Sequence, residues 1–381
     1  MLLWLALISL VFVAAAMLFL AIGNRKIRFL RDLPALLPER PPRVSVVIAA
    51  RDEQRNIGAA LESLLGQDYP HYEVIVVDDR SSDATPAIIA GKAACSGRLR
   101  MLRIAELPAG WLGKNHALDC GAHLASGDIL IFADADVVMR ADTVSRAVAH
   151  ALSARRDHIA VAPEVVTHGT ALGMVIGVFT MFFTLYARPW KAADPRSRCF
   201  IGIGAFNLVR ADVYRALGGH RRIAMRPDDD IRLGKIIKDA GYSQEMVFGR
   251  DLVRIEWYPA LAALARGFEK NVLAGVDYSV AAIIVATLAQ ALIFVWPYVA
   301  LFFTSGWTLA ANSVICALQV AAYLDQARLL GMPRWQVAGF PLAVAAFIWI
   351  LWRATFITLH NGGIDWRGTH YPLAALKANR V

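Results

Sequence analysis

The chain has 381 residues, of which 57% are hydrophobic, and its formal net charge is +9. A mean hydropathy of +0.45 excludes an ordinary soluble globular protein and indicates membrane segments. The basic residues gather beside the apolar stretches and form no aromatic-basic motif, so a bilayer surface is the expected partner and nucleic acid is not.

An uncharged apolar stretch opens the chain. Residues 1–23 are long enough to cross a bilayer as a helix, and basic residues follow in the linker 24–42. A cleaved secretory signal, the alternative, would carry its basic residues before the apolar run. The positive-inside rule places the chain after the linker in the cytoplasm. We therefore expect an uncleaved transmembrane anchor at 1–23 in the cell (inner) membrane, followed by a basic juxtamembrane linker.

The middle of the chain alternates short β-branched runs with helix-like segments. The runs cover 43–50, 72–79 and 127–136, and helical patterns begin near Asn56 and Asn115. Strands that alternate with helices are typical of an α/β fold with a mostly parallel sheet, in which ligands bind beyond the carboxyl ends of the strands.

Acidic residues follow each of these three strands. Isolated acids at such places often cap helices, and we interpret Asp83 in that way. Acids at three successive strand ends exceed what capping needs, so we predict a functional site at this edge of the sheet. These residues are Asp52, Glu53, Asp78, Asp79, Asp134 and Asp136.

Two of the acids are spaced as a metal site requires. Asp134 and Asp136, in "ADAD", lie two residues apart at the end of a strand, so that a regular strand would turn them to the same face. Mg²⁺ and Mn²⁺ prefer oxygen ligands and often take one or two carboxylates together with substrate phosphates. The spacing favours a divalent cation that holds a diphosphate.

A second acidic cluster, "PDDDIRL" at 227–233, contains Asp228, Asp229 and Asp230. Acids at a helix start interact favourably with its dipole, so a solvated helix start is one interpretation. Neighbouring carboxylates also raise one another's pKa, which suits a general base. Both interpretations hold together if Asp228 is the helix cap and a later acid is the base.

Five segments, taken in order, resemble the motifs of family-2 glycosyltransferases. They are "VSVVIAARDEQRNI", "VIVVDDRSSDAT", "FADAD", "GAFNLVRADVYRALGG" and "DDDIRLGKIIKDAGY". The resemblance covers about residues 43–270 and implies a GT-A fold, a Rossmann-like mostly parallel sheet, over a domain at 43–278. It also implies transfer of a sugar from a nucleotide-diphosphate donor with inversion at the anomeric carbon.

The resemblance assigns a role to each matching residue. In the family pattern an apolar residue follows three positions after the second acid of a pair, so Leu233 makes Asp229–Asp230 the pair and Asp230 the base. The implied donor contacts are Asp52 or Glu53, Asp79, Lys114 and Asp134; the implied metal ligands are Asp136 and Asp134; the acceptor side is implied at Gly204, Ala205 and Asn207.

The segment after the base departs from the processive members of the family. Their Q-x-x-R-W signature is missing from "ALARGFEKNVLAG" at 263–275, which favours transfer of a single sugar. Arg266 and Lys270 in this segment are basic candidates for the diphosphate side, and an amphipathic helix with interfacial charges is the equal alternative.

Further apolar stretches lie between the motifs and after them. Residues 171–190 fit a buried helix, a span or an interfacial helix that brings a lipid to the site, and we favour the last. Transmembrane helices, about three in number, are predicted at 279–358, followed by a basic membrane-proximal tail at 359–381. In that tail "WRGTHYPL" resembles the end of lipid-directed members, and we interpret Trp366 and Tyr371 as a surface anchor.

The sequence thus predicts a membrane-bound, inverting, metal-dependent glycosyltransferase with a cytoplasmic catalytic domain. Its expected partners are a UDP- or GDP-sugar donor and a membrane lipid or polyisoprenoid acceptor. A polyprenyl-phosphate sugar transferase and a non-catalytic nucleotide-binding membrane partner are the alternatives.

Overall fold

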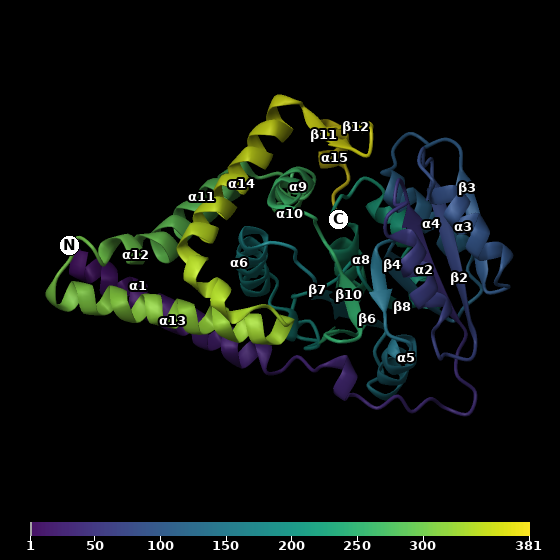
Figure 1. Cartoon of the computed structure of the whole chain (residues 1–381), viewed down its shortest axis with the longest axis horizontal. Coiled ribbons are helices and arrows are strands. Elements are labelled where there is room, and N and C mark those ends of the chain that lie inside the picture. The colour runs from purple at the N-terminus through teal and green to yellow at the C-terminus, as the bar shows by residue number, and fades with distance from the viewer. Residues whose placement is uncertain (1) are drawn as a thin grey trace. The chain divides into compact units, whose positions relative to one another are not determined.

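The computed structural model describes residues 2–381, and the chain divides into two compact units. The sheet unit comprises Ile27–Val166, Pro189–Glu256 and Arg367–Val381. The helical unit comprises the chain up to Lys26 together with Thr167–Arg188 and Trp257–Trp366. Figure 1 labels the elements of both units, and each unit is described by itself.

A seven-stranded sheet in the order β3-β2-β1-β4-β8-β6-β9 forms the centre of the sheet unit. The strands β1 to β4 are mutually parallel, β8 runs antiparallel to both of its neighbours, and β9 is parallel to β6. The predicted mostly parallel α/β sheet is therefore confirmed. The strands are β1 (Val44–Ala50), β2 (Tyr72–Asp79), β3 (Leu99–Ile104), β4 (Ile129–Asp134), β6 (His158–Ala162), β8 (Asn207–Arg210) and β9 (Gln244–Phe248).

Three helices, α4, α7 and α8, share a buried core with one face of this sheet. Their apolar side chains pack on those of β1, β2, β4 and β8. At Gly121 of α4 an added Cβ would lie 2.4 Å from Val47 Cγ1, so only glycine lets the helix approach β1 so closely. The helices of the sheet unit are α2 (Ile57–Leu65), α3 (Thr85–Ala94), α4 (Gly113–Leu124), α5 (Thr143–Ser153), α7 (Ala211–Ala216), α8 (Asp229–Asp239) and α15 (Leu373–Ala378).

The strand order positions the site. β1 lies between β2 and β4, so the connections that leave β1 and β4 turn to opposite sides and open a crevice at the carboxyl ends of these strands. A small second sheet, in the order β5-β10-β7, follows the end of β4. The remaining strands of the unit are β5 (Val137–Met139), β7 (Glu164–Val165), β10 (Val253–Ile255) and β12 (Thr369–Pro372).

The helical unit contains five helical segments that are long and apolar enough to cross a membrane. Four of them are those that the sequence predicts, and α6 is the fifth. Helix α1 packs along α13 (Figure 1), where Asn24 Nδ2 donates to Gln326 Oε1 over 3.0 Å and Gln326 Nε2 donates to Thr184 Oγ1 over 3.3 Å. The elements are α1 (Leu2–Asn24), α6 (Thr170–Ala187), α9 (Leu261–Gly267), α10 (Val272–Gly275), α11 (Val280–Gln290), α12 (Trp296–Ala300), α13 (Gly306–Leu330), α14 (Phe340–His360) and β11 (Gly363–Trp366).

The units differ from the continuous domain expected at 43–278. Helix α6 packs against α13 and α14, so it belongs to the helical unit although it lies between two segments of the sheet unit in the sequence. The tail also divides, because Arg367–Val381 belongs to the sheet unit. Tyr371, interpreted from the sequence as a surface anchor, is buried in this unit.

Candidate active site

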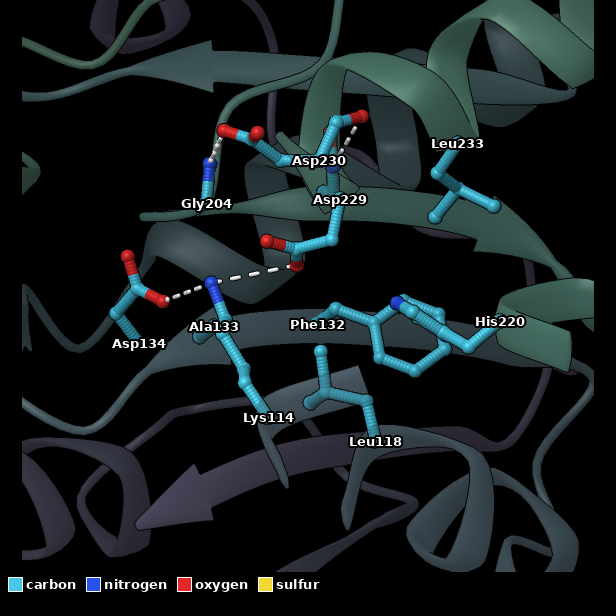
Figure 2. A pocket seen from close by; sticks show the side chains of 11 residues that line it. Lys114, Leu118, Phe132, Ala133, Asp134, Gly204, His220, Asp229, Asp230 and Leu233 are labelled. Carbon is cyan, nitrogen blue, oxygen red and sulfur yellow. Dashed lines mark hydrogen bonds and ion pairs between the residues drawn. The ribbon is translucent and has the colours of Figure 1, made fainter. Parts of the chain in front are cut away.

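A polar pocket lies at the carboxyl end of β4, where α4 and α8 begin. Figure 2 shows Lys114 at its centre, with its amino group between two carboxylates. Lys114 Nζ lies 2.8 Å from Asp134 Oδ1 and 3.3 Å from Asp229 Oδ2. Burial alone would lower the pKa of Lys114, but the charges of Asp134 and Asp229 outweigh it, and the pKa lies well above its ordinary value. Lys114 is therefore a fixed positive charge that joins the ends of β4 and α8.

Asp230 lies in the first turn of α8, and backbone amides hold its carboxylate. Gly204 N donates to its Oδ2 over 2.7 Å, as Figure 2 shows, and Ile231 N donates to its Oδ1 over 2.8 Å. The strand-like segment that carries Gly204 lies close to α8, since an added Cβ at Gly202 would be 1.7 Å from the carbonyl oxygen of Asp230. The glycine-rich motif thus allows the contact that orients the carboxylate. Each carboxylate oxygen still has a lone pair available for a proton.

The surroundings of Asp230 raise its pKa toward neutral pH. Burial and the negative charge of Asp229 raise the pKa of Asp230 to about 7, although the charge of Lys114 acts in the opposite direction. A base is most effective when its pKa lies near the working pH, so this carboxylate is suited to accept a proton from a substrate hydroxyl.

Asp228, expected to be the cap of this helix, has a different role. It occupies the N-cap position directly before α8, but its side chain makes no capping hydrogen bond. Its carboxylate instead receives two hydrogen bonds from Arg226, both 2.8 Å long, and one of 2.9 Å from Arg232. All three side chains are buried. The capping prediction was wrong because two buried guanidinium groups compete for the carboxylate oxygens.

We expect Asp228→Asn to lower the free energy of unfolding by about 3 kcal/mol, because it removes the negative charge to which two buried arginines are hydrogen-bonded. Thermal unfolding of the purified protein measures the change. Asp212→Asn is the matched control, since Asp212 is exposed and its pair with Arg210 lies at the surface. An equal loss of stability in both variants would contradict the assignment of Asp228 as a structural anchor.

The two predicted metal ligands, Asp134 and Asp136, lie on either side of the turn between β4 and β5. Burial and the neighbouring charge of Asp134 raise the pKa of Asp136 to about 7. A carboxylate in this situation is stabilised in its charged form by a cation. Among residues 2–381 no group of three or more His, Cys, Asp or Glu is arranged around a common metal position. The two carboxylates fit a Mg²⁺ or Mn²⁺ ion whose other ligands are phosphate and water oxygens.

The predicted donor residues Asp52 and Glu53 lie on the loop after β1, and Asp79 is the last residue of β2. Asp52 Oδ1 accepts hydrogen bonds from the backbone N and the hydroxyl of Ser82, over 2.8 and 3.1 Å, so it ties the two loops together. Asp79 is buried and receives hydrogen bonds of 2.7 and 3.1 Å from Arg80. These bonds leave the carboxylates ordered at the predicted strand ends.

The acceptor-side residues fall into two groups. The first group lies beside Asp230 and consists of Gly204, Ala205 and Asn207. The backbone of Gly204 also approaches Asp134, so closely that an added Cβ would lie 2.7 Å from Asp134 Oδ2. Asn207 is buried and orders the backbone, because its Oδ1 accepts from Ile203 N over 3.2 Å. Arg266 and Lys270 belong to the helical unit, so their assignment to the diphosphate stays a prediction.

Several residues of the site were missed by the sequence interpretation. His220 and Phe132 line the pocket, and Arg51, Arg80 and Arg367 neutralise the donor-side acids. Arg51 and Arg80 could have been found, since each stands next to a motif acid in the sequence. His220 and Arg367 carry no such signal, because only the tertiary structure brings them to these strand ends.

Comparison with known proteins agrees with the fold. The family model "Glycosyl transferase family 2" matches residues 45–218. A β-monoglucosyldiacylglycerol synthase from Trichormus variabilis is 37% identical over 26% of this chain and 22% of its own length. A 4,4'-diaponeurosporenoate glycosyltransferase from Staphylococcus aureus is 24% identical over 61% of each chain. The chain therefore spans less than two thirds of the length of either relative.

A solved structure shares the fold. It is a mannosyltransferase from Pyrobaculum calidifontis in complex with GDP-Man and Mn²⁺, which superposes with a TM-score of 0.53 at 20% identity, covering 94% of this chain and 98% of that one. The five apolar helical segments add a membrane-associated part to this fold. Residues 45–218 are therefore similar to family-2 glycosyltransferases, and the chain has the GT-A fold.

Proposed function

We propose that the protein is an inverting glycosyltransferase that moves one sugar from a UDP- or GDP-sugar to the hydroxyl group of a membrane lipid. The observation that carries this proposal is the carboxylate of Asp230, which backbone amides orient beside the ion-paired cluster of Lys114, Asp134 and Asp229. Lys114, Asp134, Asp229 and Asp230 line one pocket, which supports a base and a fixed cation in the same site.

In the proposed reaction Asp230 accepts the proton of the acceptor hydroxyl. The hydroxyl oxygen forms a bond to the anomeric carbon of the donor as the bond from that carbon to the diphosphate oxygen breaks. The electron pair of the broken bond leaves on the nucleoside diphosphate. Lys114 keeps Asp134 and Asp229 in place during this step. A divalent cation held by Asp134 and Asp136 would neutralise the charge of the leaving diphosphate.

The lipid acceptor and the membrane location rest on two observations. The relatives are named for a glucosyldiacylglycerol and for a diaponeurosporenoate, and the chain carries apolar helices that are long enough to span a bilayer. The basic linker supports a cytoplasmic catalytic domain at the cell (inner) membrane, with the positive residues on the inner side. A polyprenyl phosphate acceptor needs no base, so the geometry around Asp230 favours a hydroxyl.

Purified protein in detergent, mixed with Mn²⁺, a panel of nucleotide sugars and a lipid extract, tests the proposal. We expect release of UDP or GDP with one donor and a new glycolipid in the mass spectrum of the lipids. Nucleotide binding without release from any donor would favour the non-catalytic partner. Transfer only to an added polyprenyl phosphate would contradict the lipid hydroxyl as acceptor.

We also expect the protein to bind Mn²⁺ through the two acids after β4. Asp136→Asn should weaken Mn²⁺ binding at least about tenfold, because the ion loses one of two charged protein ligands. Titration of free Mn²⁺ by electron paramagnetic resonance, with UDP or GDP present, measures this without requiring turnover. Asp142→Asn is the control, since Asp142 lies on the following turn and is paired with Arg140 and Arg146. Equal affinity in Asp136→Asn and the native protein would contradict the metal site.

A further inference from the structure

The segment Arg367–Val381 contacts three separate parts of the sheet unit. The first contact is with the loop after β1. Arg367 Nη1 donates to the carbonyl oxygen of Arg51 over 2.5 Å and to that of Asp52 over 3.4 Å, and Arg367 Nη2 forms an ion pair with Glu53. One guanidinium group thus holds both the backbone and a carboxylate of the loop that carries the predicted donor acids.

Arg367 adds to the bonds that join this loop to the loop after β2 and the start of α3, where Ser81 Oγ accepts from Asp52 N over 3.0 Å and Thr85 Oγ1 accepts from Glu53 N over 2.8 Å. Asp52 adopts a left-handed backbone with φ of 52°, which is uncommon for a residue other than glycine. Burial raises the pKa of Glu53, and the positive charge of Arg367 opposes that shift. The guanidinium group therefore favours the ionised form of Glu53 while it fixes the loop. A lysine has no planar set of donors and could not hold the two carbonyls and the carboxylate together.

The second contact is at the start of α4. Tyr371 is buried, and its hydroxyl accepts a hydrogen bond of 3.3 Å from Gly113 N. Gly113 lies against Asp79, since an added Cβ would be 2.1 Å from Asp79 Oδ2. The next residue is Lys114. Tyr371 therefore fixes the helix start that sets both the position of Lys114 and the space beside Asp79.

The third contact is beside α8. Asn379 Oδ1 accepts from Met225 N over 2.9 Å, and Asn379 Nδ2 donates to the carbonyl oxygen of Arg222 over 3.0 Å. Arg232 Nη1 donates to the carbonyl oxygen of Val381 over 3.1 Å, and the same side chain holds Asp228 at the start of α8. The segment thus also supports the helix that carries Asp230.

We propose that Arg367–Val381 is a strap that orders the donor-nucleotide side of the active site, with Arg367 and Tyr371 as positioning residues for the loop of Asp52 and Glu53 and for Lys114. The strap joins the ends of β1 and β2 to the starts of α4 and α8. These are connections between elements, and such connections are mobile unless other groups hold them. The nucleotide part of this inference rests on the proposed function.

Hydrogen exchange of the full-length protein in detergent tests the strap without any ligand. We expect Arg367→Gln to speed amide exchange in residues 51–54 about tenfold or more, because the loop loses its charged hydrogen bonds. Arg367→Lys should protect the loop only in part. Tyr371→Phe keeps the ring and should speed exchange at Gly113 and Lys114. The matched control is Arg380→Gln, which removes the same charge from an exposed side chain of the same segment.

Binding of UDP and GDP by calorimetry tests the functional part. We expect about tenfold weaker binding of the nucleotide in Arg367→Gln, a melting temperature close to that of Arg380→Gln, and a higher KM with a smaller change in kcat. Unchanged exchange in residues 51–54 would overturn the strap, and so would an equal change in the control. Tighter nucleotide binding in Arg367→Gln would show that Arg367–Val381 covers the site, and this result would also overturn the strap. If the native protein binds neither nucleotide, the proposed function fails, while the exchange rates still decide whether the segment is a strap.

Discussion

Asp230→Asn is expected to lower the rate of sugar transfer by about 10²–10⁴-fold while the protein still binds its nucleotide. Asparagine keeps the shape of the side chain, but its single carbonyl oxygen can accept only one of the two hydrogen bonds that Gly204 N and Ile231 N donate to Asp230, and it cannot take a proton from a hydroxyl group. The loss should therefore appear in kcat, with the affinity for UDP or GDP little changed. Initial rates of nucleotide release and calorimetric binding measure the two effects separately.

The control for this prediction lies on the same helix. Asp239→Asn, at the exposed end of α8, removes one charge from a side chain that pairs only at the surface with Lys235. It should leave the rate within about twofold of native. Native turnover in Asp230→Asn would contradict the assignment of the base. Loss of nucleotide binding together with turnover would instead assign Asp230 to the donor.

Much of the sheet could be predicted from the sequence, because its signals are local. The β-branched runs at 43–50 and 72–79 form β1 and β2 almost to the residue, and the acids after them lie at the carboxyl ends of the strands as expected. The sequence assigned the glycine-rich segment only to the acceptor side of the site and did not predict its contact with Asp230. The hydrogen bond from Gly204 depends on the close approach of two backbones, which has no local pattern beyond the glycines themselves.

The errors of the sequence interpretation have a common physical origin. Asp228 has the residue type and the position of a cap, yet buried arginines take its oxygens, and Arg226 reaches full burial only in the folded chain. Tyr371 was interpreted from the sequence as a membrane-surface anchor, but its side chain is buried in the sheet unit. Each outcome depends on contacts with segments that are distant in the sequence.

Lys114→Met is the second large effect that we expect, and it should act on both the rate and its pH dependence. Lys114 forms ion pairs with Asp134 and Asp229, and its charge lowers the pKa of Asp230. Without it, the charges of Asp229 and Asp134 and the burial of Asp230 all act to raise that pKa from about 7. Less of the base is then ionised at neutral pH. We expect kcat/KM at pH 7 to fall about fivefold, and the rising limb of the pH–rate profile to move up by about one pH unit.

Lys114→Arg distinguishes the effect of the charge at this position from the effect of the side-chain shape. Arginine keeps the positive charge, so the rising limb should stay near its native position even if the larger guanidinium group lowers the rate. Lys92→Met, on α3, removes a lysine whose partner Glu62 lies at the surface, and it should change neither property. A limb at the native pH in Lys114→Met would contradict electrostatic control of Asp230, whereas a limb displaced equally in Lys114→Arg would assign the effect to packing. The sign of the displacement is decisive, because a purely structural loss lowers the rate at every pH without moving the limb.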